Sequence, residues 1–254
     1  MGKKRRRGYG APGGFWTQEV GGAPYWFIGL AVIAMFGIGT YALVAAPATP
    51  TAASTPRPIP TFTYSDRTPT PEKPTALFIG DSYTAGAGGG GTRWTTIVSA
   101  ELGWVENNQG RGGTGYVSTS NEEGCGLAYC PTFVEMVDEI EADPSIVVIS
   151  GGRNDANKAG LAEAAVAVIE AVQAKWPAAR VIVTSPLWDD DPQPLWFPTM
   201  ATTIEEAATS RGAEYLALGQ PIEGDSALVD ADGVHPNSAG YEAIAAAFLT
   251  AAGS

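Results

Sequence analysis

The chain has 254 residues and is acidic, with 15 Lys and Arg against 27 Asp and Glu, one His and two Cys. A formal charge of −12 without a long basic tract argues against a nucleic-acid partner, because phosphate binding depends on clustered Lys and Arg. One His and two Cys are too few for the usual zinc sites, and we expect neither a metal nor another cofactor.

The N-terminal part differs in charge from the rest of the chain. Residues 1–24 carry a net charge of +4, whereas residues 75–254 carry −17. Residues 25–46 hold no charged side chain, and about 20 apolar residues are enough for a helix to cross a bilayer. Because basic flanks stay in the cytoplasm, we expect a cytoplasmic N-terminus, a transmembrane signal anchor at residues 25–46 and an outward-facing body.

A cleaved signal peptide is the alternative, with Val44 and Ala46 as small residues at the cleavage site. The apolar run exceeds the roughly 7–15 residues of a signal-peptide core, which favours an uncleaved anchor. The body is exported in both cases. Residues 47–74 contain eight Pro and seven Thr without a helical or alternating pattern, and this composition predicts an extended linker.

The two cysteines, Cys125 and Cys130, are separated by four residues. In an oxidising compartment we expect them to form a disulfide that closes a small loop. The alternative is a pair of free cysteines in the core.

Residues 75–254 are enough for one domain. Short apolar runs recur in them, each followed by a turn-rich loop and a helical pattern: residues 76–80, 104–107, 146–150, 181–185 and 215–218. This alternation predicts an α/β fold, with a five-stranded parallel sheet between two layers of helices. Two apolar stripes have helical spacing: Leu161, Ala165, Val168, Ile169, Val172 and Trp176, and Tyr241, Ile244, Ala245, Phe248 and Leu249.

The loops that follow parallel strands converge at one edge of the sheet, where ligands bind. Ser82, Gly113, Asn154, Asp232 and His235 all lie in such loops. A serine needs a base to become a nucleophile, and His235 is the only imidazole, which Asp232 can orient. The N–H groups of Ser82 and Gly113 and the amide of Asn154 can stabilise an oxyanion, so this set predicts acyl-transfer chemistry.

The blocks FIGDSYTAG, the glycine turn ending at Gly113, GGRND and DGVHPN resemble the SGNH/GDSL hydrolase superfamily in order and spacing. The resemblance implies a flavodoxin-like three-layer α/β/α fold. It also implies Ser82 as the nucleophile, Gly113 and Asn154 in the oxyanion hole, and His235 with Asp232 as base and orienter.

Two details depart from that pattern or leave a choice. Tyr83 stands where the name of the family has leucine. Gly110 and Gly112 compete with Gly113 for the oxyanion position, and counting from Asn108 selects Gly113.

Each candidate also has a simpler interpretation by itself. Ser82 can cap a helix, Asn154 can hold a turn, and a single His such as His235 is more often structural. The coincidence of complementary groups on one sheet edge favours catalysis.

Two further features follow the fourth predicted strand. Asp189, Asp190 and Asp191 could attract calcium, but adjacent carboxylates cannot all face one ion, so we expect a solvated loop. Trp188 and Trp196 can form an aromatic wall for a sugar ring or an acyl chain, and ordinary packing is an equal alternative.

These observations together predict a membrane-tethered, outward-facing serine esterase that acts on an ester of a cell-envelope or extracellular molecule, such as an acetylated polysaccharide. The alternatives are an O-acyltransferase with the same triad and a non-catalytic carbohydrate-binding module on a stalk.

Overall fold

The computed structural model describes residues 19–20, 23–24 and 72–253 of the chain. The expected membrane anchor at residues 25–46 lies outside the described residues. Among those that are described, no helix has the length and hydropathy needed to cross a membrane. Strands β1 (Glu19–Val20) and β2 (Ala23–Pro24) form a short antiparallel pair.

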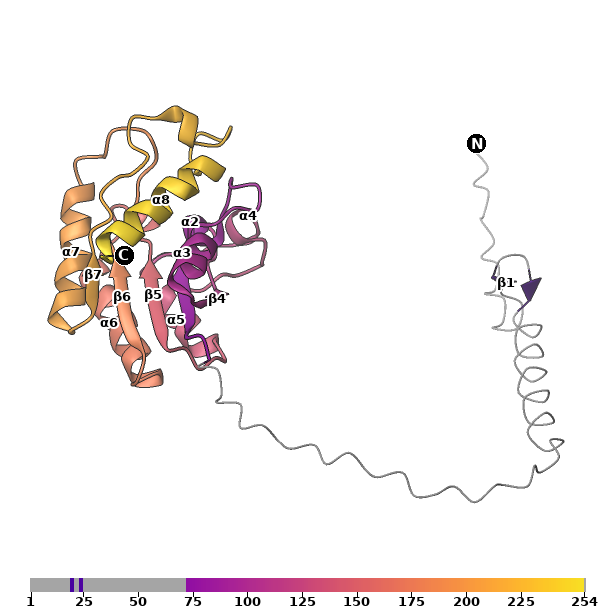
Figure 1. The fold of residues 1–254 in the computed structure, drawn as a ribbon, viewed down its shortest axis with the longest axis horizontal. Helices are drawn as coiled ribbons and strands as arrows, with labels where there is room; N and C mark the ends of the chain where they lie inside the picture. The colour runs from indigo at the N-terminus through magenta and orange to yellow at the C-terminus, as the bar shows by residue number, and fades with distance from the viewer. Residues whose placement is uncertain (1–18, 21–22, 25–71, 254) are drawn as a thin grey trace, which may run out of the picture. The chain divides into compact units, whose positions relative to one another are not determined.

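From residue 72 onwards the chain is built on one parallel sheet with the strand order β4-β3-β5-β6-β7 (Figure 1). The strands are β3 (Thr75–Gly80), β4 (Val105–Asn108), β5 (Ile146–Ser150), β6 (Arg180–Thr184) and β7 (Glu214–Leu216). This order is that of flavodoxin-like sheets, in which the second strand along the chain lies outside the first. The predicted five-stranded α/β fold is confirmed, and each apolar run overlaps one strand.

Helices follow every strand of this sheet. They are α2 (Ser82–Ala85), α3 (Trp94–Leu102), α4 (Glu122–Cys125), α5 (Phe133–Glu139), α6 (Leu161–Lys175), α7 (Phe197–Ser210) and α8 (Ser238–Ala251), with short 3-10 helices η2 (Arg153–Asp155) and η3 (Ser226–Leu228). Helices α3 and α8 pack together on one face of the sheet, and α5, α6 and α7 cover the other. Both predicted apolar stripes belong to these helices, α6 and α8.

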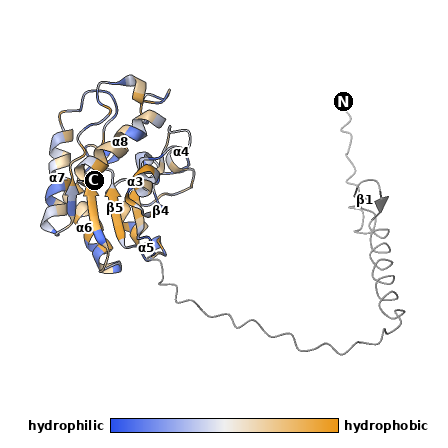
Figure 2. Ribbon diagram, viewed as in Figure 1, coloured by the Kyte–Doolittle hydropathy of each residue, from blue (hydrophilic) through white to orange (hydrophobic). Residues whose placement is uncertain are grey.

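The strands supply buried side chains to both helical layers. Leu77 and Val147 contribute to the core under α5, α6 and α7, whereas their neighbours Phe78 and Val148 contribute to the core under α3 and α8. Successive strand residues point to opposite faces, so a sheet covered on both sides needs an apolar residue at nearly every position. Figure 2 shows the central strands as continuously hydrophobic.

Aromatic packing fixes the helix that follows the predicted histidine loop. Trp94 of α3 lies edge-on to Phe78, with 5.5 Å between ring centroids, and 5.4 Å from Phe248 of α8. The side chain of Asn237 caps α8 by accepting a hydrogen bond from the N–H of Gly240. His235 therefore lies three residues before the first residue of a helix that is anchored to the core.

Candidate active site

Ser82 is the first residue of α2, directly after the turn that ends β3. The side chain of Asp81 caps this helix by accepting a hydrogen bond from the N–H of Tyr83 at 2.9 Å. The capping function that Ser82 could have served therefore belongs to Asp81. Within the described part of the chain the Ser82 hydroxyl makes no hydrogen bond, and the residue is 9% exposed. Its oxygen is free for chemistry.

Asp232 and His235 form the expected pair within one short loop. One carboxylate oxygen of Asp232 accepts hydrogen bonds from the backbone N–H groups of Val234 and His235, each at 2.9 Å, and the other lies 2.6 Å from His235 Nδ1. Gly233 turns the chain between them with a φ of +70°, a conformation that favours glycine. The hydrogen bond with His235 is the main reason why the pKa of Asp232 falls to about 2.

An ionised Asp232 can only accept a hydrogen bond, so His235 Nδ1 carries the proton. The other ring nitrogen, Nε2, has no hydrogen-bond partner among the described residues. This is the tautomer that a general base for a serine requires.

The loops of Ser82 and His235 contact each other, although 151 residues separate Tyr83 from Val234. The Tyr83 hydroxyl donates a hydrogen bond to the Val234 carbonyl oxygen at 2.5 Å, and the rings of Tyr83 and His235 lie 6.0 Å apart. Gly88 lies so close to this loop that a Cβ atom there would be 2.8 Å from the Cβ of His235. The hydroxyl and the imidazole thus belong to two touching loops at the same edge of the sheet.

The glycine turn after β4 lies beside Ser82. Gly113 has a φ of +75°, and an added Cβ would lie 2.5 Å from Ser120 Oγ. A Cβ on Gly112 would lie 3.7 Å from the Cβ of Ser82, whereas one on Gly110 would meet the backbone of Ala85. The structure therefore places Gly112 against Ser82, with Gly113 next to it in the chain and packed against Ser120. The N–H groups of Ser82 and Gly113 have no acceptor within residues 72–253, so both can donate to a ligand.

Asn154 lies in η2 with its side chain directed at the same turn. Its Nδ2 donates one hydrogen bond to the Thr114 carbonyl oxygen at 2.9 Å, which leaves the second amide hydrogen available.

Asp155 is 2% exposed and is not among the site residues expected from the sequence. Its carboxylate accepts hydrogen bonds from the backbone N–H groups of Tyr116, Val117 and Ser118 and from the Ser118 hydroxyl, at 2.7–3.0 Å. Asp155 thus ties the segment after Gly113 to the loop that carries Asn154. An acidic residue directly after the asparagine of GGRND was the only signal for it.

The expectation that Asp189, Asp190 and Asp191 form a solvated loop does not hold for Asp189. Its side chain is 9% exposed and forms an ion pair with Arg153, at 2.9 Å between Nη2 and Oδ2. Asp191, in contrast, is exposed as expected. The expectation was wrong for Asp189 because its partner comes from another loop.

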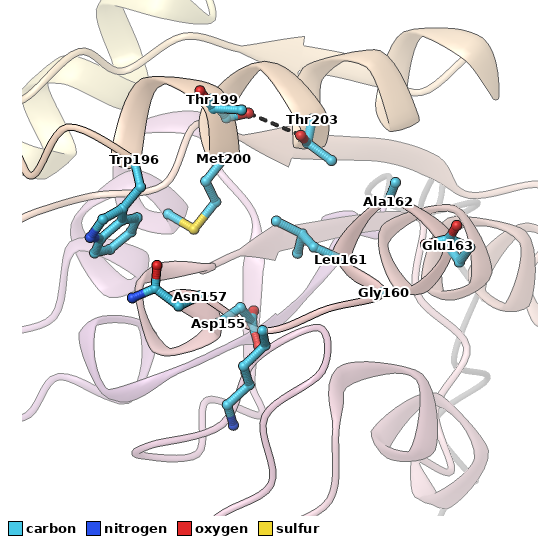
Figure 3. Close-up of a pocket in the computed structure, with 11 residues that line it drawn as sticks. Asp155, Asn157, Gly160, Leu161, Ala162, Glu163, Trp196, Thr199, Met200 and Thr203 are labelled. Carbon is cyan, nitrogen blue, oxygen red and sulfur yellow. Dashed lines mark hydrogen bonds between the residues drawn. The ribbon is translucent and has the colours of Figure 1, made fainter.

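The rings of Trp188 and Trp196 pack edge-on, with 5.5 Å between their centroids, but the two side chains have different further contacts. Trp188 covers the Arg153 guanidinium, 4.6 Å from the ring centroid. Trp196 lines a cavity of about 430 Å³ beside the loop after β5, between the first turns of α6 and α7. Figure 3 shows Trp196 on the wall of this cavity together with Asn157 and Met200.

Cys125 and Cys130 are joined by a disulfide in the structure. The bonded loop begins at the end of α4, where the carbonyl oxygen of Gly124 would lie 2.0 Å from a Cβ on Gly112. The residue directly before the disulfide-closed loop therefore packs against the glycine turn.

The model of the GDSL-like Lipase/Acylhydrolase family matches residues 78–243. No curated protein matches the sequence.

Several solved structures share the fold. A protein from Lactobacillus plantarum aligns with a TM-score of 0.55 and 18% identity over 70% of this chain and 96% of its own. A family two carbohydrate esterase from Clostridium thermocellum, in complex with cellohexaose, aligns with a TM-score of 0.54 and 20% identity over 72% of this chain and 64% of its own. A family 2 carbohydrate esterase from Corynascus thermopiles aligns with a TM-score of 0.53 and 21% identity over 73% of this chain and 69% of its own.

The cap of α2 leads to a prediction for stability against pH. Burial raises the pKa of Asp81 to about 6, so the folded protein holds this proton more tightly than the unfolded chain does. The stability that Asp81 contributes is therefore fully present below about pH 4 and is lost as pH rises through about 6. Asp81→Asn cannot ionise and keeps an oxygen for the Tyr83 N–H. In thermal unfolding, the Tm of this variant should therefore rise relative to that of the wild type between pH 4 and pH 7.

Glu141→Gln, which removes an exposed carboxylate, is the matched control and should track the wild type across this range. A constant difference in Tm between Asp81→Asn and the wild type would contradict the prediction.

Proposed function

Because this chain belongs to the GDSL-like lipase/acylhydrolase family, it is a carboxylic ester hydrolase, and we propose that it is a membrane-tethered, outward-facing serine esterase. Its substrate class is an ester of a cell-envelope or extracellular molecule, with O-acetyl groups on a polysaccharide as the best fit. The contact between Asp232 and His235, on a loop that touches the Ser82 loop, carries this proposal.

In the proposed reaction Ser82 Oγ attacks the ester carbonyl carbon while His235 Nε2 accepts its proton. Asp232 stabilises the resulting imidazolium. The N–H groups of Ser82 and Gly113 and the amide of Asn154 donate to the oxyanion of the tetrahedral intermediate. The alcohol leaves with the proton from His235, and water then repeats the attack on the acyl-enzyme and releases the carboxylic acid.

Two observations support a sugar ester as the substrate. Two structural neighbours are carbohydrate esterases, one of them solved with cellohexaose. In addition, Trp196 and Asn157 line the cavity beside the Asn154 loop. An indole ring with a polar side chain nearby suits a pyranose ring, which has both apolar C–H faces and hydroxyls.

The tether is proposed from the sequence. The uncharged run of residues 25–46, behind a basic N-terminus, is long enough to span a bilayer and orients the body outward. The Pro/Thr-rich linker of residues 47–74 gives the esterase reach from the membrane to a polymer.

Ser82→Ala tests the nucleophile. The variant should lose several orders of magnitude in turnover of an aryl acetate, as other serine hydrolases do without their nucleophile. A fluorophosphonate probe should label the wild type on the peptide that contains Ser82 and leave the variant unlabelled. Ser210→Ala, at the end of α7, is the control and should keep wild-type turnover and labelling.

Retained turnover in Ser82→Ala would reject the mechanism, and absence of probe labelling would favour a non-catalytic binding module. Product analysis with added sugar acceptors separates hydrolysis from O-acyl transfer, because a transferase gives an acylated acceptor where a hydrolase gives free acid.

Trp196→Ala tests the sugar subsite. The KM for an acetylated oligosaccharide should rise about tenfold through the loss of ring stacking, whereas the KM for a small aryl acetate, which does not reach the cavity, should stay within about twofold. Equal changes for the two substrates would show that Trp196 does not contact the sugar.

Cell fractionation tests the tether. The full-length chain should be recovered with membranes and should be degraded by protease added to intact cells. A chain that begins near residue 47 in the medium would indicate signal cleavage, and full-length protein in the cytosol would contradict export in either form.

A further inference from the structure

The hydroxyl of Tyr83 has two partners on different loops. One is the carbonyl oxygen of Val234, at 2.5 Å, and the other is the Arg153 guanidinium. A carbonyl only accepts hydrogen bonds and a guanidinium only donates them, so the phenol must donate to Val234 and accept from Arg153. A leucine at this position, as in the name of the family, could form neither bond.

Arg153 is itself held in place. Its Nη2 donates to Asp189, and its guanidinium lies between the rings of Tyr83, at 4.9 Å, and Trp188, at 4.6 Å. The side chains of Arg153 and Asp189 are only 11% and 9% exposed, so water screens their ion pair weakly. The connection from Asp189 through Arg153 and Tyr83 to Val234 links the loops that follow β6, β5, β3 and β7.

The loop that carries His235 needs such a support. Asp232, Gly233 and Val234 are exposed, and most hydrogen bonds of residues 230–235 remain within the loop. Among the described residues, the bond from Tyr83 is the one hydrogen bond between residues 230–235 and a loop other than their own. Without it, the contacts of His235 with the Tyr83 ring and with Gly88 would remain on the Ser82 side, and neither is a hydrogen bond.

The geometry points to Tyr83 as a positioning residue: supported by Arg153 and Asp189, its hydroxyl holds the His235 loop so that the imidazole stays within reach of Ser82. This inference rests on the proposed esterase function. Displacements near 1 Å can cost about 100-fold in rate, so one hydrogen bond to an exposed loop can control turnover without touching substrate.

The protonation state of Tyr83 agrees with this function. Burial raises the pKa of Tyr83 well above its usual value, so the hydroxyl keeps the proton that it donates to Val234. The bond therefore persists across the pH range in which an esterase works.

Tyr83→Phe in the full-length chain, purified in detergent, is the direct test. The variant keeps the ring contacts with His235 and Arg153 and loses only the hydroxyl. With an aryl acetate as substrate, kcat should fall about tenfold while KM stays within about twofold, because binding is intact and the base is less often in place. A kcat within twofold of the wild type would overturn the inference.

Tyr215→Phe is a matched control. Tyr215 of β7 is half-buried and its hydroxyl forms a hydrogen bond with Ser185, so this variant loses a phenol hydrogen bond that involves neither the His235 loop nor the segment around Gly88. Its kcat should stay within about twofold of the wild type. An equal fall of kcat in both variants would assign the effect to general loosening and would also overturn the inference.

The single histidine of the chain provides a spectroscopic readout. In protein prepared without a histidine tag, the proton on His235 Nδ1, bonded to Asp232, should give a ¹H NMR resonance far downfield. Tyr83→Phe should broaden or shift this resonance, and Tyr215→Phe should leave it unchanged. An unaltered resonance in Tyr83→Phe would contradict positioning by the hydroxyl.

Ser82→Ala distinguishes failure of the proposed esterase function from failure of the positioning function of Tyr83. If that variant keeps its turnover, the proposed function itself fails. If it loses turnover while Tyr83→Phe behaves as the wild type, only the positioning function of Tyr83 fails.

Discussion

A parallel sheet buried on both faces is the constraint on which the rest of this structure depends. Parallel strands begin at one edge of the sheet and end at the other, so the loops after them leave from a common edge. The register aligns Gly80 at the end of β3 with Ser150 at the end of β5, and the loops of Ser82 and Asn154 therefore start side by side. The packing of the two cores secures this register, because a shift by one residue would move each strand side chain from one core to the other.

Buried polar side chains, more than the backbone alone, shape the loops at that edge. Asp155 collects hydrogen bonds from the segment after the glycine turn, and Arg153 with Asp189 joins two neighbouring loops. Burying a charge is costly unless it is paired or hydrogen-bonded, so these side chains hold their loops to a narrow range of geometries. That rigidity is useful where a serine, an imidazole and several N–H donors must converge.

The predicted strands and the candidates Ser82, Asn154, Asp232 and His235 could be taken from the sequence because their signals are local. Asp232 and His235 lie three residues apart around a glycine, and the apolar runs report strands directly. The choice among the glycines of the turn rested on a count, and the structure shows that packing demands glycine at Gly110, Gly112 and Gly113 alike. The solvated interpretation failed for Asp189 because burial by a distant loop leaves no local pattern.

The sequence by itself determined the α/β fold, the order of the motifs and the chemical types available for a site, since apolar periodicity and loop composition are properties of neighbouring residues. Only the tertiary structure decided which polar groups meet. The hydroxyl of Tyr83 forms hydrogen bonds with Arg153, 70 residues away in the sequence, and with Val234, 151 residues away. Such contacts depend on how the sheet brings its loops together. The neighbouring sequence therefore does not distinguish a side chain that makes them from any other residue that follows a strand.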